Sequence, residues 1–200
     1  MPSPNAPADS PPLNLDPGGV ESRSLRARLL GRLRGERSLA QMRRRGLRAA
    51  PPVRTGRRVF IDAEYAWAIE IGAFTILAND VRIIAHDAAV KRLTGYTEVR
   101  PVTIGQRCYL GAGALVLPGA VIGDDAIIGA GAVVRGEIPA GSVAVGTPAR
   151  PIGTVAELRE RHLADLERFP RLDRWPGDLS AAERERLQRD LAESGRVYLY

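Results

Sequence analysis

Residues 104–139 read IGQRCY LGAGAL VLPGAV IGDDAI IGAGAV VRGEIP when the sequence is divided into blocks of six. Each block begins with a branched aliphatic residue, and its fifth residue is small or aliphatic, from Cys108 to Ile138. A period of six fits neither an amphipathic helix nor an alternating strand. It indicates short extended runs separated by corners, where glycine supplies unusual backbone angles or permits close approach. Three runs would close a triangular coil of about 18 residues, and stacked coils would bury a continuous core.

The same period continues, with weaker matches, on both sides of this stretch. It is recognisable from Val59 in the blocks VFIDAE YAWAIE IGAFTI LANDVR IIAHDA, and it fades through AGSVAV GTPARP. We therefore predict a repeat domain over residues 59–153.

The repeat is interrupted once. Ile104, the next clear block start after Ile83, lies 21 residues further along the chain. We interpret this spacing as one coil of 18 residues plus a shift of three residues in the repeat. Residues 87–101 are predicted to form a loop that leaves the coil directly after His86. Binding residues concentrate on loops that a rigid scaffold carries.

The N-terminal third differs in composition from the repeat. Residues 1–20 are rich in Pro, Ser, Asp and Gly and are predicted to be a disordered arm. Residues 21–58 hold 13 Arg and 2 Glu, so this segment carries +11 of a chain whose net charge is +6. We predict one or two amphipathic helices here, followed by a connector over residues 51–58.

The basic segment has three interpretations. It caps the end of the coil, it binds an anionic membrane surface peripherally, or it binds nucleic-acid phosphates. No aromatic residue accompanies its arginines, which favours the cap and weakens both the membrane and the nucleic-acid interpretation. The sequence contains no long apolar run and no signal-like N-terminus, so we expect a cytoplasmic protein.

Residues 154–200 are predicted to form a helical extension. Thr154 with Glu157 and Ser180 with Glu183 have the spacing of capping boxes, so helices are expected over residues 154–169 and 180–193. The final GRVYLY is expected to pack as an aromatic strand on the body. Together the two helices are expected to cover the open edge of the last coil.

These blocks and the closing string IGAGAVVRGEIPAGSVAVGTPARPI resemble the hexapeptide-repeat acyltransferases, in the branch of the maltose, galactoside and capsular polysaccharide O-acetyltransferases. The resemblance implies a mainly β fold, a left-handed parallel β-helix, and homotrimers with sites between subunits. It also implies acetyl-CoA as co-substrate without a metal. The left hand comes from the resemblance alone, because general rules favour right-handed parallel crossovers.

The candidate base is His86, in IIAHDAAVKRLTGYTEVRPVTIG. The family's catalytic His stands at this place, before a loop and a Pro-Val-x-Ile-Gly restart, which corresponds to residues 101–105. An imidazole can take the proton of a sugar hydroxyl as it attacks a thioester, and a backbone N–H would stabilise the oxyanion. No Ser or Cys nucleophile beside a second His is evident, so direct transfer is favoured. Asp62 stands where the family has an Asn that lies near the acceptor.

Further site residues follow from the resemblance. The acetyl-CoA contacts carried over from the family motifs are Ala112, Ala130, Arg135 and Arg150. The expected acceptor contacts are Trp67, Asp87, Arg92, Tyr96 and Tyr109. His162 and Cys108 are expected to pack structurally, Cys108 as a small buried residue without a disulfide partner.

We thus predict an O-acetyltransferase acting on a hydroxyl of a sugar or surface glycan. The alternatives are a sibling enzyme that acetylates an antibiotic, serine or another small molecule, and a non-catalytic β-helix scaffold. A carbonic anhydrase of the same fold is excluded, because its three-His zinc site cannot be assembled from the two histidines of this sequence.

Overall fold

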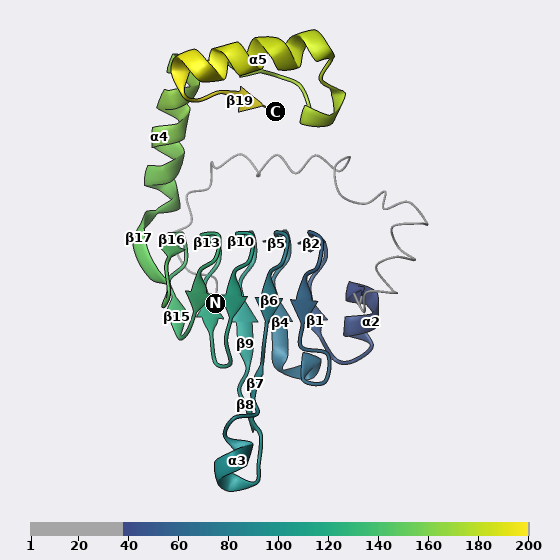
Figure 1. The fold of residues 1–200 in the computed structure, drawn as a ribbon. Coiled ribbons are helices and arrows are strands. Elements are labelled where there is room, and N and C mark those ends of the chain that lie inside the picture. Colours follow the sequence, from purple (N-terminus) through teal and green to yellow (C-terminus); the bar gives the residue numbers. More distant parts are fainter. Residues whose placement is uncertain (1–37, 200) are drawn as a thin grey trace.

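The computed structural model describes residues 38–199, and these form a stack of coils with a hairpin on one side and a helical arm on another (Figure 1). Each coil contributes one short strand to each of three sheets in turn. Pairing between successive coils is parallel throughout the three sheets, apart from the last strand. The protein is therefore mainly β, with the triangular parallel coil that the period of six predicts.

The three sheets form the walls of the stack, and their strands follow one another from the first coil to the last. Sheet A contains β1 (Arg48–Ala49), β4 (Ile69–Ile71), β9 (Val102–Ile104), β12 (Val121–Ile122) and β15 (Glu137–Ile138). Sheet B contains β2 (Arg54–Thr55), β5 (Ile76–Leu77), β10 (Tyr109–Leu110), β13 (Ile127–Ile128), β16 (Ser142–Val145) and β17 (Arg150–Thr154). Sheet C contains β3 (Phe60–Ile61), β6 (Arg82–Ile83), β11 (Leu115–Val116) and β14 (Val133–Val134).

The first and fifth residues of each block form the core, as predicted. In the regular coils a residue pairs with the one 18 positions later, for example Leu110 with Ile128. Leu110, Val116 and Ile128 are completely buried, as are the small residues Ala114 and Ala132. The repeat is therefore a narrow column of aliphatic side chains, with the alternate residues of the strands facing outward.

The second-position glycines serve close approach rather than unusual backbone angles. A Cβ on Gly111 would lie 2.5 Å from the backbone nitrogen of Ala130 on the next coil. The left-handed residue is instead the fourth of each block over residues 104–133, as at Gly113, Gly131 and Asp125. The two positions thus have separate reasons for their small or polar side chains.

The coil begins earlier than the sequence pattern indicates. Residues 51–58 are not a connector, because β2 lies within them and β1 precedes them. Three residues are the inward positions of a first coil, because they pair with core residues of the next one: Ala49 with Ile71, Thr55 with Leu77, and Ile61 with Ile83. Ala and Thr lack the bulk that marks later blocks, which hides the period. The predicted block start at Val59 was also wrong by two residues, because the buried residue that faces the core is Ile61.

A short insertion further obscures this first coil. Between β3 and β4 the chain forms η1 (Ala66–Ala68), a turn of 3₁₀ helix. Ile61 to Ile71 is therefore ten residues rather than six. Both strands around the insertion nevertheless keep parallel partners in the next coil.

The predicted excursion after Ile83 is a hairpin arm, and the interpretation of its length was wrong. Ile83 belongs to sheet C and Ile104 to sheet A, which is the next sheet along the coil. Core residues on consecutive sheets are normally six residues apart, so 15 of the 21 residues are an insertion. The arm comprises β7 (His86–Asp87), α3 (Lys91–Thr94) and β8 (Glu98–Val99), and β7 pairs antiparallel with β8. Its tip, marked by α3, projects far from the coils (Figure 1).

Both C-terminal helices form with the predicted capping boxes. They are α4 (Val155–Arg168) and α5 (Ala181–Ser194), with Thr154 and Ser180 as N-caps. Between them lie β18 (Arg171–Leu172) and η2 (Pro176–Asp178), and β19 (Tyr198–Leu199) pairs with β18. GRVYLY therefore packs within the arm and not on the body, contrary to the prediction.

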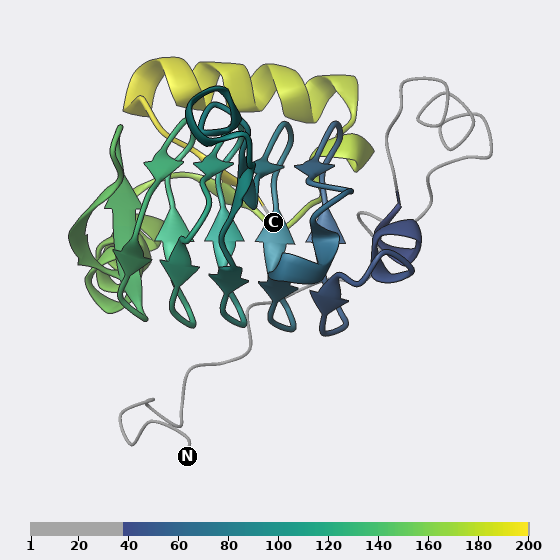
Figure 2. The same ribbon diagram turned by 90° about the horizontal axis from the view of Figure 1, so that it is seen from below.

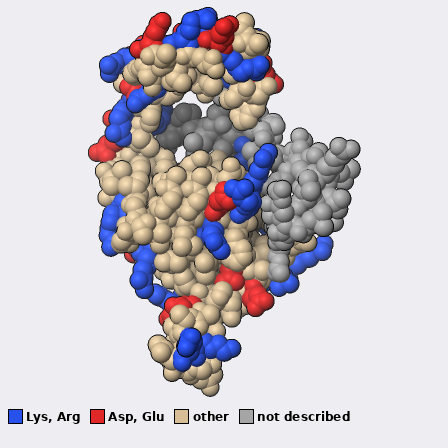
Figure 3. Space-filling model, viewed as in Figure 1, with Lys and Arg blue, Asp and Glu red and all other residues tan. Residues whose placement is uncertain are grey.

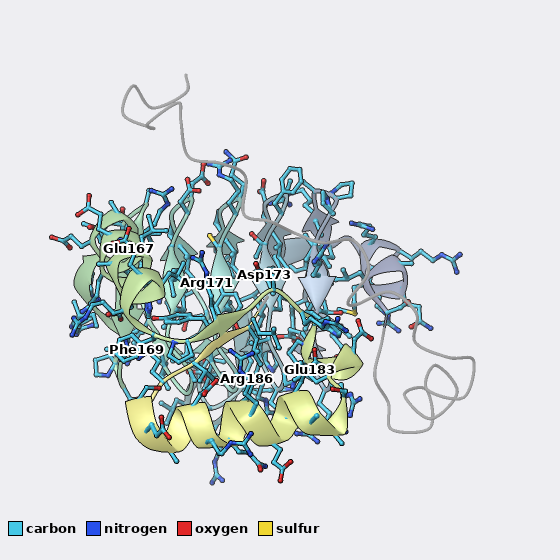
Figure 4. All side chains as sticks on the ribbon, turned by 90° about the horizontal axis from the view of Figure 1, so that it is seen from above. Glu167, Phe169, Arg171, Asp173, Glu183 and Arg186 are labelled. Atoms are coloured by element: carbon cyan, nitrogen blue, oxygen red, sulfur yellow. The ribbon has the colours of Figure 1, made fainter. Side chains whose placement is uncertain are left out.

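The expected cover of the last coil is also different. The edge of sheet B is closed by β17, which pairs antiparallel with β16. α4 then leads away from the last coil and α5 lies along the stack (Figures 1 and 2). Viewed from above, the link that carries Phe169, Arg171 and Asp173 crosses the coils before α5 begins near Glu183 (Figure 4). The antiparallel strand thus performs the edge protection expected of the helices.

At the N-terminal end, α2 (Leu39–Arg43) packs Met42 into the core. This helix is the described portion of the predicted basic helices; the arm over residues 1–20 and most of the Arg-rich segment lie outside the described residues. Within residues 38–199, no helix has the length and apolar character needed to cross a bilayer.

Candidate active site

The site is built on the residues that directly follow the strands of sheet C. Asp62, Ile84, Leu117 and Arg135 occupy the same position on four successive coils. Their register is held by backbone bonds of about 3 Å, from Asp62 N–H to Ile83, from Ile84 N–H to Val116, and from Leu117 N–H to Val134. Sheet C thereby sets Asp62 at one end of a row and Arg135 at the other.

Asp62 is buried, and its carboxylate has two described hydrogen-bond partners. One oxygen accepts from the backbone N–H of Ala85 at 3.2 Å and also bonds Nδ1 of His86. A buried carboxylate is costly unless such partners satisfy it. Because Asp62 occupies Nδ1, the proton on that nitrogen is held and Nε2 is left as the basic nitrogen of a neutral imidazole.

The imidazole is held on a second side by an aromatic ring. The Tyr65 ring lies 4.6 Å from the His86 ring between centroids, with the two planes at 34°. Tyr65 itself packs on the core through the insertion that contains η1. The His86 side chain keeps 31 % of its surface exposed, so it is oriented without being closed off.

A pocket of about 310 Å³ opens beside His86. Its floor is the sheet C row at Ile84, Leu117 and Arg135. The remaining lining residues come from the hairpin base and the turn after β11, and they are His86, Asp87, Glu98, Arg100 and Pro118. The pocket therefore places the imidazole among two carboxylates and two guanidinium groups.

The structure gathers some of the predicted site residues and separates others. His86, Asp62, Asp87 and Arg135 lie together at this pocket or directly behind it. Arg92 and Tyr96 are exposed at the hairpin tip, where Figure 3 shows a cluster of basic side chains. Trp67 is half exposed on η1 and does not line the pocket.

The remaining predicted contacts lie beyond the opposite edge of sheet C. Ala112 and Ala130 are exposed at the corner between sheets B and C, Tyr109 faces outward on β10, and Arg150 opens β17. A Cβ on Gly113 or on the equivalent Gly131 would meet nothing within 4 Å. This corner therefore presents open backbone, separated from the His86 pocket by the outer face of sheet C.

Tyr65, Glu98 and Arg100 were not predicted as site residues. The contact of Tyr65 depends on the insertion in the first coil, and the contacts of Glu98 and Arg100 depend on the closure of the hairpin. The sequence carries no signal for either, apart from the position of Arg100 directly before the Pro101 restart.

Two other groups are structural. Cys108 is buried with its Sγ 3.1 Å from the carbonyl oxygen of Gly123, and burial raises the pKa of the thiol to about 11. His162 bonds Tyr198 in the C-terminal arm. Among residues 38–199, no group of three or more His, Cys, Asp or Glu side chains is arranged to hold a metal ion.

Comparison with known proteins identifies the family of the chain. Residues 101–136 match the model of the bacterial transferase hexapeptide family. A serine acetyltransferase of Helicobacter pylori is 38 % identical over 118 residues, which cover 58 % of this chain and 67 % of that protein. The chain belongs to the hexapeptide-repeat transferase family. It is accordingly an acyltransferase.

Among solved structures, a maltose O-acetyltransferase from Clostridium difficile 630 is similar with a TM-score of 0.46 and 25 % identity, covering 68 % of this chain and 79 % of that one. A galactoside acetyltransferase in complex with coenzyme A gives a TM-score of 0.43 and 21 % identity, with coverages of 66 % and 84 %.

Proposed function

We propose that this hexapeptide-repeat transferase moves an acetyl group from acetyl-CoA to a hydroxyl of a sugar or surface glycan, with His86 as general base. The observation that carries the proposal is the Asp62–His86 pair at the edge of an open pocket. A neutral imidazole with one free nitrogen is the group that such a transfer needs.

The transfer is direct. Nε2 of His86 takes the proton of the acceptor hydroxyl as its oxygen attacks the thioester carbonyl. The tetrahedral intermediate then collapses, the carbon–sulfur bond breaks, and the CoA thiolate takes the proton from His86. The products are the acetyl ester and CoA, and His86 is neutral again. Asp62 holds the ring and stabilises the imidazolium between the two steps.

The donor is proposed to lie along the corner between sheets B and C. Ala112 and Ala130 present small exposed residues there, and the neighbouring glycines leave the backbone open to a close ligand. Arg150 lies toward the last coil of the same corner and suits a CoA phosphate. The acetyl end would then cross the outer face of sheet C to reach His86.

A trimer is proposed from the outward faces of the coils. The outward rows of sheets B and C include apolar residues, which are Ile76, Tyr109, Ile127 and Val143 on B and Phe60, Leu115 and Val133 on C. Apolar rows of this kind favour contact with another subunit. We also propose that the coil is left-handed, as the family resemblance implies. Sedimentation analysis that gives a monomer would contradict the trimer.

Acetylation of serine or another small molecule is the second candidate. It is favoured by the Helicobacter relative, whose name is serine acetyltransferase. Acetyl-CoA turnover, followed as thiol release, should be measured with serine, neutral sugars, sugar phosphates and antibiotics. Turnover with sugars that is lost in His86→Ala supports the proposal. Turnover confined to serine supports the second candidate, and thermal stabilisation by CoA without turnover of any acceptor supports a scaffold.

A further inference from the structure

Arg100 is the pocket residue whose placement the transfer mechanism does not explain. It directly follows Val99, which is the cross-strand partner of His86 in the hairpin. Its backbone N–H donates to the carbonyl of Ala85 at 2.9 Å. The base of the hairpin therefore fixes the backbone of Arg100 beside Ala85 and His86.

The guanidinium of Arg100 lies flat on the turn after β11. A Cβ added to Gly119 would lie 2.5 Å from both Cζ and a terminal nitrogen of Arg100. The turn has a left-handed residue at Gly119 and follows Leu117, one of the floor residues. The absence of a side chain at Gly119 thus makes room for the planar group at the pocket wall.

Arg135 reaches the same pocket from the next coil. Among the described residues, neither Arg100 nor Arg135 forms a salt bridge. Their nearest charged companions in the pocket lining are Asp87 and Glu98, which face each other across the hairpin. Two guanidinium groups without a salt bridge at one end of a pocket suit a carboxylate or a phosphate, because each guanidinium can bind such an anion through two hydrogen bonds.

The position of these arginines indicates the size of the acceptor. Asp62 lies on the first coil, and the turn under Arg100 lies two coils further along sheet C. Two strand spacings amount to about 10 Å. A hydroxy amino acid carries its carboxylate and hydroxyl on adjacent carbons, whereas an anionic sugar also has hydroxyl groups across the ring from its anionic group.

We infer that Arg100, together with Arg135, binds an anionic group of the acceptor, and that the acceptor is a sugar bearing a carboxylate or a phosphate. This inference rests on the proposed sugar O-acetylation, and it assigns Arg135 to the acceptor rather than to CoA. Asp87 and Glu98 then face the hydroxyl groups of the same sugar and accept hydrogen bonds from them.

The test compares matched acceptors in the full-length protein. Thiol release from acetyl-CoA is measured with galactose against galacturonate and with glucose against glucose 1-phosphate, which separates carboxylate from phosphate. The wild type should prefer the anionic member of at least one pair. In Arg100→Gln the KM for that acceptor should rise at least about tenfold and by more than the KM for the neutral sugar, while the KM for acetyl-CoA stays within about twofold. Arg48→Gln, on sheet A and ion-paired with Glu70, is the control and should match the wild type.

Two results would overturn the inference. One is an equal preference for neutral and anionic sugars in the wild type, which leaves sugar acetylation intact. The other is a rise in the KM for acetyl-CoA instead of the acceptor in Arg100→Gln, which assigns the arginine to the donor. If no sugar is acetylated, the proposed function fails. Binding then decides the anion site: thermal stabilisation by galacturonate or glucose 1-phosphate that Arg100→Gln abolishes supports it, and none in the wild type refutes it.

Discussion

Asp62 and His86 come from different coils, and the hydrogen bond between them crosses the edge of sheet C. Asp62 follows β3 and His86 begins β7, so the pair exists only when the first coil and the hairpin are both folded. The same carboxylate fixes the backbone of Ala85. Catalysis should therefore depend on the charge of Asp62 as well as on its hydrogen bonds.

Replacement of Asp62 by Asn should therefore impair catalysis more than stability. One carboxylate oxygen bonds both the Ala85 N–H and His86 Nδ1, so an Asn oxygen in the same place keeps both hydrogen bonds but loses the negative charge that stabilises the imidazolium. We expect kcat to fall by at least about 100-fold with the acceptor KM nearly unchanged, similar to His86→Ala, where loss of a general base costs about 10²–10⁴-fold. Steady-state kinetics of acetyl-CoA consumption measure both.

Asp62→Ala is the matched control for that experiment. It leaves the Ala85 N–H without its acceptor, so the free energy of unfolding should drop by about 1–3 kcal/mol in addition to the loss of activity. If Asp62→Asn retained near wild-type kcat, the charge of Asp62 would not contribute to the transfer.

Tyr65 should act through its ring and not through its hydroxyl. Its ring contacts the imidazole, and the structure records no hydrogen bond from its hydroxyl within residues 38–199. Tyr65→Phe should keep kcat within about twofold, whereas Tyr65→Ala should lower it by about tenfold because the imidazole loses one of its two supports. An equal loss in both variants would show that the hydroxyl takes part.

The regular coils and the position of His86 at the base of an excursion could be predicted from the sequence because both leave local signals. Aliphatic residues at every sixth position mark 104–139, and His86 precedes a clear break in that period. The first coil is missed because Ala49 and Thr55 occupy its inward positions without the usual bulk. Arg100 and Tyr65 are missed because their contacts come from an insertion and a hairpin closure, which depend on tertiary packing and not on any repeat.

Cys108 gives the protein a specific sensitivity to high pH. Burial raises the pKa of its thiol from 9.0 to about 11. The unfolded chain therefore ionises this group first, so its contribution to stability is complete below about pH 9 and is lost as the pH rises toward 11. A shift of about two units corresponds to about 2–3 kcal/mol.

The measurement is the free energy of unfolding by urea from pH 8 to 11, in the wild type and in Cys108→Ala. The difference between the two proteins should shrink by about 2 kcal/mol across this range, because the variant lacks the titrating group. The native thiol should also resist thiol reagents at pH 8 and react after unfolding. A difference that stays constant with pH would contradict the burial argument.

The two kinds of glycine in one block can be separated by a pair of substitutions. Gly111 lies against the backbone of the next coil, where an added Cβ would meet Ala130 N at 2.5 Å and Ile128 O at 2.8 Å. Gly113 has a left-handed φ of +70° with open space around it. Gly113→Ala should cost about 1–2 kcal/mol from backbone strain alone. Gly111→Ala should cost at least about 3 kcal/mol, because it forces two coils apart and strains their strand pairing. Urea unfolding of both variants tests this order, and an equal or smaller loss for Gly111→Ala would mean that the coils can separate without weakening the stack.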